Sequence, residues 1–190
     1  MISKRAKAAC NFFTKDRADD YEPRAKSRGL WELERVELEA IIDSLPYGLK
    51  VLDIPVGTGR LLSAFDRRGF DVLGLDASPY MVARAKALNT GARLDVASIF
   101  ELPAEDQSFD VTFCIRLFHL IEHSDFVIAL EELKRVTKQK IVLTVRFGND
   151  DSPCRGPERL NLFMANLYGW RIVRETRVHG DWYLFVLDRC

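Results

Sequence analysis

The sequence predicts an α/β fold, namely a doubly wound, mostly parallel, seven-stranded sheet with an antiparallel strand near the C-terminus. Two observations favour it. Short apolar runs alternate with longer stretches whose apolar residues recur at helical spacing, as in parallel sheets covered by helices on both faces. The last two β-rich runs, Trp170–Val178 and Trp182–Leu187, are separated by a tight turn. We therefore expect them to pair in antiparallel fashion.

The length and composition are those of one globular domain. The 190 residues are 47% apolar and 29% charged, which is enough to bury a substantial core. No internal repeat is recognisable. We expect a single domain over residues 1–190, made of an N-terminal helical lid (1–45) and an α/β core (46–190).

The balance of charge argues against capture of nucleic acid by bulk electrostatics, because 28 basic and 28 acidic residues cancel. No apolar run approaches the ~18 residues that a membrane helix needs, and the N-terminus carries no apolar signal core. The cysteines are widely spaced and form no CxxC pair, which predicts reduced thiols, a cytoplasmic location and no metal site. They are Cys10, Cys114, Cys154 and Cys190.

Residues 1–29 are polar and basic, and we expect one or two short helices that are broken at Pro23. Two interpretations of this segment stay open. It forms a solvated helix face that covers the fold, or a substrate-facing flap that uses Tyr21 and Arg24.

A helix is predicted next, over Leu30–Leu45, from its apolar spacing. Its charged residues, Glu34 among them, are expected on the solvated side, and Leu38 falls outside the apolar stripe. That stripe is Leu30, Leu33, Val36, Ala40, Ile41 and Leu45.

The later elements continue the alternation of strands and helices. Ser78 and Pro79 are predicted as the N-cap and first position of one helix, and Ser124 with Asp125 as the cap of another. The expected strands in this part are Asp71–Asp76, Arg93–Ile99, Phe109–Leu117 and Lys140–Phe147, and a further helix is expected around Leu160–Tyr168.

The stretch Lys50–Leu62 has the pattern of a short strand, a tight glycine turn and the first turn of a helix. Gly57 and Gly59 lack a Cβ, so they can adopt positive φ and permit close approach of a ligand. That ligand would lie against the N–H groups that a helix leaves unpaired at its start. Asp53, at the strand end, could meet hydroxyls or an ammonium group. Two glycines alone are equally compatible with an ordinary βα turn.

The kind of ligand follows from what the turn lacks. A nicotinamide dinucleotide fold would show G-x-G-x-x-G, and Leu62 stands at the third glycine. No lysine follows Gly59, so the phosphate loop of nucleotide hydrolases is excluded. Asp76 ends the second strand at about the 20-residue interval typical of an acid that accepts ribose hydroxyls. The sequence therefore predicts a nucleoside ligand without phosphates.

Four segments, in this order and spacing, resemble the class I S-adenosylmethionine-dependent methyltransferases, specifically the small methyltransferase-11-like group. The resemblance covers about residues 50–146. Its segments are Val51–Gly59, Leu73–Ser78, Leu102–Asp110 and Ala129–Val136. It implies a Rossmann-like core that binds S-adenosylmethionine as its cofactor.

The resemblance also implies roles for matching residues. Those around the methionine part of the cofactor and its ribose are Asp53, Gly57, Gly59 and Asp76. Those against the adenine or beside the donor methyl are Ala77, Met81, Ser98, Ile99 and Ile115. Two residues depart from the family pattern. Ser98 stands where an aspartate often faces the adenine amino group, and Pro55, within the same implied cofactor site, replaces the first glycine of the turn. Proline stiffens the turn if that position has negative φ and makes no ligand hydrogen bond.

Methyl transfer from a sulfonium is an in-line displacement with an activated leaving group, so positioning supplies much of the rate and a general base is optional. His119, after the fourth strand, is a candidate base because the reference pKa of histidine lies near neutrality. A capping or packing role is the alternative for it. Arg116 would suit an anionic substrate, and a salt bridge with a nearby acid is equally compatible with the sequence.

The sequence thus predicts transfer of a methyl group to an O or N nucleophile of a small molecule or glycan, which would be bound by Tyr21, Arg24 and Arg116. An RNA or protein methyltransferase is an alternative, suggested by the basic N-terminal segment. Another is a regulatory module that binds S-adenosylmethionine without turnover. The acceptor, its reacting atom and the oligomeric state do not follow from the sequence.

Overall fold

The computed structural model describes residues 14–27, 32–148 and 157–190, without the side chains of residues 22–27 and 157. Seven strands within these ranges form one mixed sheet. They are β1 (Lys50–Asp53), β2 (Asp71–Asp76), β3 (Arg93–Val96), β4 (Phe109–Cys114), β5 (Thr137–Arg146), β6 (Trp170–His179) and β7 (Trp182–Arg189). The strand predicted over Asp71–Asp76 is confirmed with its bounds. The strands predicted over Arg93–Ile99, Phe109–Leu117 and Lys140–Phe147 are present with changed ends, because β3 ends at Val96, β4 ends at Cys114 and β5 begins at Thr137.

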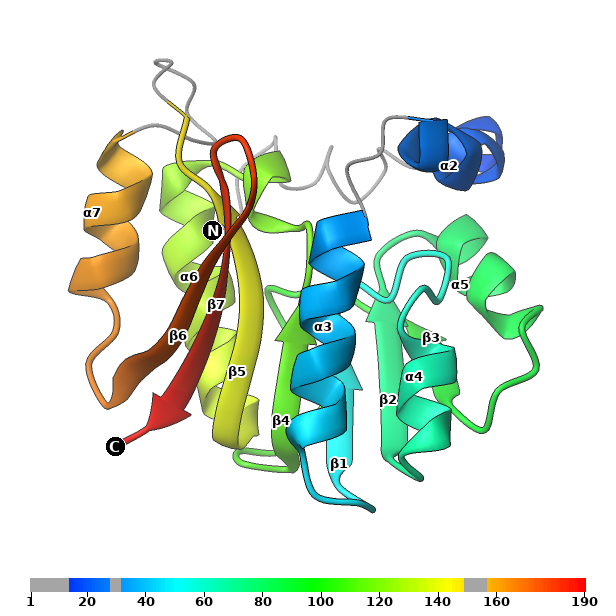
Figure 1. Ribbon diagram of the computed structural model, residues 1–190, viewed down its shortest axis with the longest axis horizontal. Helices are drawn as coiled ribbons and strands as arrows, with labels where there is room; N and C mark the ends of the chain where they lie inside the picture. Colours follow the sequence, from blue (N-terminus) through cyan, green and yellow to red (C-terminus); the bar gives the residue numbers. More distant parts are fainter. Residues whose placement is uncertain (1–13, 28–31, 149–156) are drawn as a thin grey trace.

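The strand order is β3-β2-β1-β4-β5-β7-β6 (Figure 1). The first five strands pair in parallel, and β7 pairs antiparallel with both β5 and β6. This arrangement confirms the predicted fold class, including the antiparallel strand near the C-terminus.

Helices lie on both faces of the sheet (Figure 1). They are α2 (Lys15–Ser27), α3 (Glu32–Ser44), α4 (Leu62–Arg67), α5 (Pro79–Lys86), the 3-10 helix η1 (Phe118–Leu120), α6 (His123–Val136) and α7 (Pro157–Ala165). Two apolar cores result. One packs α6 and α7 against the sheet, and the other packs α3 and α4 against the opposite face. Within the described residues, no helix has the length and apolar composition to cross a membrane.

The prediction that Pro23 breaks the N-terminal helix is wrong. The helix α2 runs from Lys15 to Ser27 without interruption. A proline removes a single backbone N–H from the helical ladder, and the hydrogen bonds of the turns on either side are sufficient to continue it. An ion pair between Asp19 and Arg84 fastens α2 to α5.

The predicted apolar stripe is confirmed at Ile41 and at Leu45, just beyond α3, which are both buried, but it is wrong nearer the start of the helix. Leu33 and Val36 are 66% and 51% exposed, whereas Leu38 is fully buried. Glu34, expected on the solvated side, is also fully buried. The helix is turned this way because the carboxylate of Glu34 forms ion pairs inside the protein, described below, and Leu38 follows one turn later on the same face.

Two helix caps were predicted, with different outcomes. The Ser78 side chain accepts a hydrogen bond from the backbone N–H of Met81, and Pro79 follows at the first helical position, which confirms that cap. The predicted cap of α6 is wrong, because Glu122 occupies the N-cap and the helix already begins at His123. Glu122 has the extended backbone of an N-cap residue, so Ser124 and Asp125 fall within the first turn.

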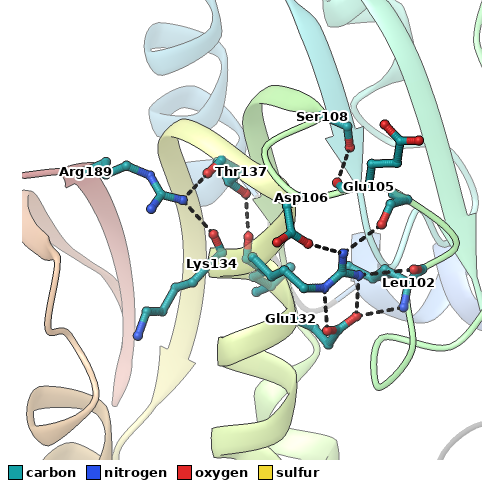
Figure 2. A network of polar contacts seen from close by, with 11 residues as sticks. Leu102, Glu105, Asp106, Ser108, Glu132, Lys134, Thr137 and Arg189 are labelled. Atoms are coloured by element: carbon teal, nitrogen blue, oxygen red, sulfur yellow. Dashed lines mark hydrogen bonds and ion pairs between the residues drawn. The ribbon is translucent and has the colours of Figure 1, made fainter.

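The polar loop between β3 and β4 is fastened to α6 by the guanidinium of Arg135. Figure 2 shows Leu102, Asp106 and Glu132, which take part in this network of polar contacts. This group donates to the carbonyl oxygens of Leu102 and Ala104, at 3.2 and 2.8 Å. It also contacts the carboxylates of Asp106 and Glu132, at 2.9 and 2.8 Å. Glu132 in turn accepts the backbone N–H of Leu102 at 2.9 Å. One side chain therefore fixes the path of the loop that leads away from the ligand pocket described below.

We predict that Arg135→Ala lowers the free energy of unfolding by roughly 1–3 kcal/mol, because two loop carbonyls and two carboxylates lose a charged donor. Urea denaturation measures this change. Arg93→Ala is the matched control, since its exposed ion pair with Asp71 is expected to contribute less than about 1 kcal/mol. Equal losses in the two variants would contradict the role assigned to Arg135.

Candidate functional site

A pocket lies at the carboxyl ends of the parallel strands, where the strand order reverses between β1 and β4. Open α/β sheets bind their ligands at this position. The space within it, including its open mouth, is about 1080 Å³, which accommodates a nucleoside-sized ligand. Elements from α2 to the segment after β4 contribute to its lining.

Part of the glycine turn lines this pocket. Gly57 and Gly59 have φ of 57° and 87°, a region that side chains disfavour. Gly57 lines the pocket. Gly59 is not among the lining residues, and a Cβ there would lie 2.8 Å from Leu88 and 2.9 Å from Leu62. The positive φ of Gly59, together with this close packing against α4 and the residue Leu88 beyond α5, favours glycine at this position.

Asp76, at the end of β2, holds the turn in place. One carboxylate oxygen accepts the backbone N–H of Gly57 at 3.0 Å, and the other accepts that of Ser78 at 2.8 Å. Burial raises the pKa of Asp76, and these two hydrogen bonds act in the opposite direction. Each carboxylate oxygen has a second acceptor position, so Asp76 can also bind ligand hydroxyls.

Asp53, at the end of β1, is the most perturbed acid of the pocket. Only 2% of it is exposed. Burial raises its pKa to about 8, the charge of Asp76 acts in the same direction, and the guanidinium of Arg60 opposes both. A buried carboxyl whose pKa stays raised in spite of an arginine charge is a site that a positively charged ligand group would stabilise.

The other predicted cofactor residues divide into two sets. Ser98 is not among the lining residues, and its hydroxyl accepts the backbone N–H of Phe100 at 3.3 Å. This hydrogen bond stabilises a local turn after β3, in which the backbones of Ser98 and Glu101 form an isolated antiparallel bridge. Those that line the pocket are Pro55, Ala77, Met81, Ile99 and Ile115.

The three residues with predicted catalytic or acceptor roles that the structure describes all line the same pocket, namely Tyr21, Arg116 and His119. The side chain of Arg24 lies outside the described residues. The ring of His119 meets Trp182 edge-on, with 4.7 Å between ring centroids. Burial raises the pKa of Tyr21, and the nearby charges of Arg60 and Arg116 oppose that shift.

Arg116 is held in an unusual conformation. Its φ is 64°, which costs energy for a residue other than glycine. Its backbone N–H donates to the Thr144 hydroxyl at 2.7 Å. Its guanidinium lies 4.0 Å from the centre of the Trp182 ring and donates from Nε to Glu34 at 2.8 Å.

Sequence reasoning missed three residues of this region: Glu34, Arg60 and Trp182. Glu34 receives Arg60 Nη1 on one oxygen and Arg116 Nε on the other, each at 2.8 Å. A signal for it was present. Glu34 shares a helical face with Leu38, Ile41 and Leu45, at intervals of four and three residues.

Strand order, glycine turn and strand-end acid together define a Rossmann-like domain with a pocket for a nucleoside-type ligand. Residues 51–140 match the model of a family described as a methyltransferase domain. This segment includes the glycine turn and Asp76. The match and the fold confirm the resemblance to class I S-adenosylmethionine-dependent methyltransferases.

A curated relative covers part of the chain. The ubiquinone biosynthesis O-methyltransferase of Aliivibrio fischeri is 40% identical over 82 residues, which is 40% of this chain and 34% of the relative. The chain therefore spans about a third of the length of this relative.

Solved structures match over more of the chain. An S-adenosylmethionine-dependent methyltransferase from Aquifex aeolicus has a TM-score of 0.70 at 22% identity, covering 94% of this chain and all of that one. Magnesium protoporphyrin IX methyltransferase from Synechocystis PCC 6803, with bound S-adenosylmethionine, has a TM-score of 0.67 at 18% identity. This match covers 85% of this chain and 80% of the Synechocystis chain. At these identities the likeness establishes the fold.

We predict that Asp53→Asn stabilises the ligand-free protein near neutral pH by roughly 1–3 kcal/mol, because the wild-type carboxyl, ionised in the unfolded chain, must take up a proton on folding and the amide does not. The pKa of Asp53 is raised on folding, so its stabilising contribution is complete below about pH 4 and is lost as the pH rises through about 8. The difference between variant and wild type should therefore grow from pH 4 to 8 in thermal melts.

Asp66→Asn, at an exposed position of α4, is the control and should change the melting temperature much less than Asp53→Asn does at pH 8. A pH-independent difference for Asp53→Asn would contradict the buried, protonated state of this carboxyl.

Proposed function

We propose that this protein binds S-adenosylmethionine in the pocket at the ends of β1, β2 and β4 and transfers its methyl group to an oxygen or nitrogen of a small molecule. The observation that carries the proposal is the pair of buried acids, Asp53 and Asp76, that lines one pocket beside a glycine turn. That pair lies within the segment that matches the methyltransferase-domain family.

The residues fit this ligand in order along the pocket. The carboxyl of Asp53 would meet the ammonium of the methionine part, and binding there would deprotonate it. The remaining acceptor positions of Asp76 would take the ribose hydroxyls. The apolar side chains of Met81 and Ile99 would enclose the adenine.

The bound sulfonium supplies an activated methyl group. As the acceptor atom forms its bond to the methyl carbon, the carbon–sulfur bond breaks and its electron pair stays on sulfur. The chain has to exclude water and hold the acceptor in line with that bond. His119 lines the pocket and is the candidate group to take the acceptor's proton.

The acceptor side of the pocket is mostly apolar. Leu117, Leu120 and Ile121 line it together with His119 and Arg116. Such a wall fits an apolar or aromatic small molecule better than a glycan, because sugar hydroxyls would lose hydrogen bonds to water there. The relative from Aliivibrio fischeri is named as an O-methyltransferase, which supports an oxygen nucleophile.

We predict that Asp76→Asn weakens S-adenosylhomocysteine binding by roughly 1–3 kcal/mol, because a charged acceptor for two hydroxyls is replaced by a neutral one. Isothermal calorimetry measures the dissociation constant. Asp71→Asn, at the opposite end of the same strand, should leave the dissociation constant unchanged. An unchanged constant for Asp76→Asn would remove Asp76 from the cofactor site.

We predict that the wild-type protein forms S-adenosylhomocysteine from S-adenosylmethionine when small phenols, carboxylates or amines are supplied. Mass spectrometry of both products measures turnover. Binding without turnover on this panel would favour a regulatory module, and salt-sensitive retention of RNA on filters would favour a nucleic-acid substrate. Binding of NAD in place of S-adenosylhomocysteine would overturn the proposal.

A further inference from the structure

We propose that Glu34 is a positioning residue of this site, which holds Arg60 at the cofactor end of the pocket and Arg116 at the acceptor end. The inference rests on the proposed function for the two ligands. It extends that function to a helix outside the segment that matches the methyltransferase-domain family, since α3 precedes residue 51.

The geometry is a carboxylate bridge between two distant parts of the core. Arg60 follows the glycine turn and Arg116 follows β4, and Glu34 binds one with each of its oxygens at 2.8 Å. Glu34 is fully buried, whereas the two arginine side chains are 20% and 12% exposed. Both arginines line the pocket and Glu34 does not. It therefore acts through them and not by touching a ligand.

The ion pairs of Glu34 do more than attach α3 to the core, as a comparison with a neighbouring ion pair of the same helix indicates. Glu37, one turn along the same helix, also forms an ion pair, with Arg174 of β6, and is 27% exposed. That pair serves to attach the helix. A fully buried carboxylate is costly unless it is paired, so its partners must keep their positions. The two guanidinium groups are thereby fixed relative to each other.

Arg60 connects the bridge to cofactor binding. Its charge lowers the pKa of Asp53, but burial has the larger effect, and its guanidinium is bound to Glu34 at 2.8 Å. The groups that act on Asp53 are Arg60 from the glycine turn and Asp76 from β2, and Asp53 itself acts on the Cys114 thiol of β4. Without Glu34, Arg60 would turn toward Asp53 and ionise it, and so compete with the ammonium group of the cofactor.

Arg116 connects the bridge to the acceptor. Its positive φ, its hydrogen bond to Thr144 and its position over Trp182 would each allow several placements of the guanidinium. The bond from Nε to Glu34 selects one of them. Catalysis by positioning is sensitive to displacements of about 1 Å, so this selection matters for turnover.

The test compares Glu34→Gln with the matched control Glu37→Gln in the full chain. Calorimetry with S-adenosylhomocysteine in two buffers of different ionisation enthalpy gives the dissociation constant and the number of protons released. We expect close to one proton released by the wild type at pH 7, from Asp53. In Glu34→Gln we expect at least about tenfold weaker binding and less than half of that proton release. Glu37→Gln should match the wild type within about twofold.

The outcomes are separable. No S-adenosylhomocysteine binding by the wild type would overturn the proposed function itself. Wild-type affinity and proton release in Glu34→Gln would overturn the positioning role alone. A lowered melting temperature with unchanged proton release would show that Glu34 has a structural role only, and this also overturns the proposal.

Glu34→Asp provides the same readouts if Glu34→Gln does not fold, because it keeps the charge and shortens the side chain by one methylene. We expect weaker binding and less proton release than in the wild type, since one aspartate cannot reach both arginines at 2.8 Å. Wild-type values in Glu34→Asp would contradict positioning.

Discussion

The site depends on how the chain after β1 is fixed between its two neighbouring strands. The N–H of Ile54 donates to Phe113 of β4 at 3.0 Å, and that of Val56 donates to Leu75 of β2 at 2.7 Å. The Asp76 carboxylate then binds the N–H of Gly57. These bonds place the glycine turn above the sheet edge in a single conformation, because each buried N–H would otherwise lack a partner. The pocket lies between this turn, the residues that follow β2 and the segment after β4.

Charge is distributed unevenly in that space. Two acids, Asp53 and Asp76, lie buried at the ends of adjacent strands, and two arginines that line the same pocket share the carboxylate of Glu34. Burial raises the pKa of both acids; the charge of Arg60 opposes that shift at Asp53 and two backbone hydrogen bonds oppose it at Asp76, without outweighing it. A ligand with a cation near Asp53 would relieve this imbalance. A ligand rich in phosphate would add negative charge beside the same acids.

Much of the fold and part of the site could be predicted from the sequence. β1, β2 and the cap at Ser78 were predictable because their signals are local: an apolar run, a terminal aspartate and Ser-Pro. The buried face of α3 was not predictable by counting apolar residues, because Glu34 is buried through pairing with arginines far along the chain. The position of Ser98 outside the pocket lining was not predictable for a similar reason, since its place in the turn beyond β3 depends on where that strand ends.

The position of Glu34 indicates that the N-terminal helices α2 and α3 contribute to the pocket and do not only cover it. A lid would close over a finished site, and its removal would leave the pocket's walls in place. Here α3 provides the shared partner of two wall residues, and α2 contributes Tyr21 to the lining itself. Loss of α3 would leave two guanidinium groups without their common carboxylate, and like charges in a partly buried wall repel. The Rossmann-like core therefore needs α3 for the electrostatic arrangement of its pocket, even though the match to the methyltransferase-domain family begins only at Val51.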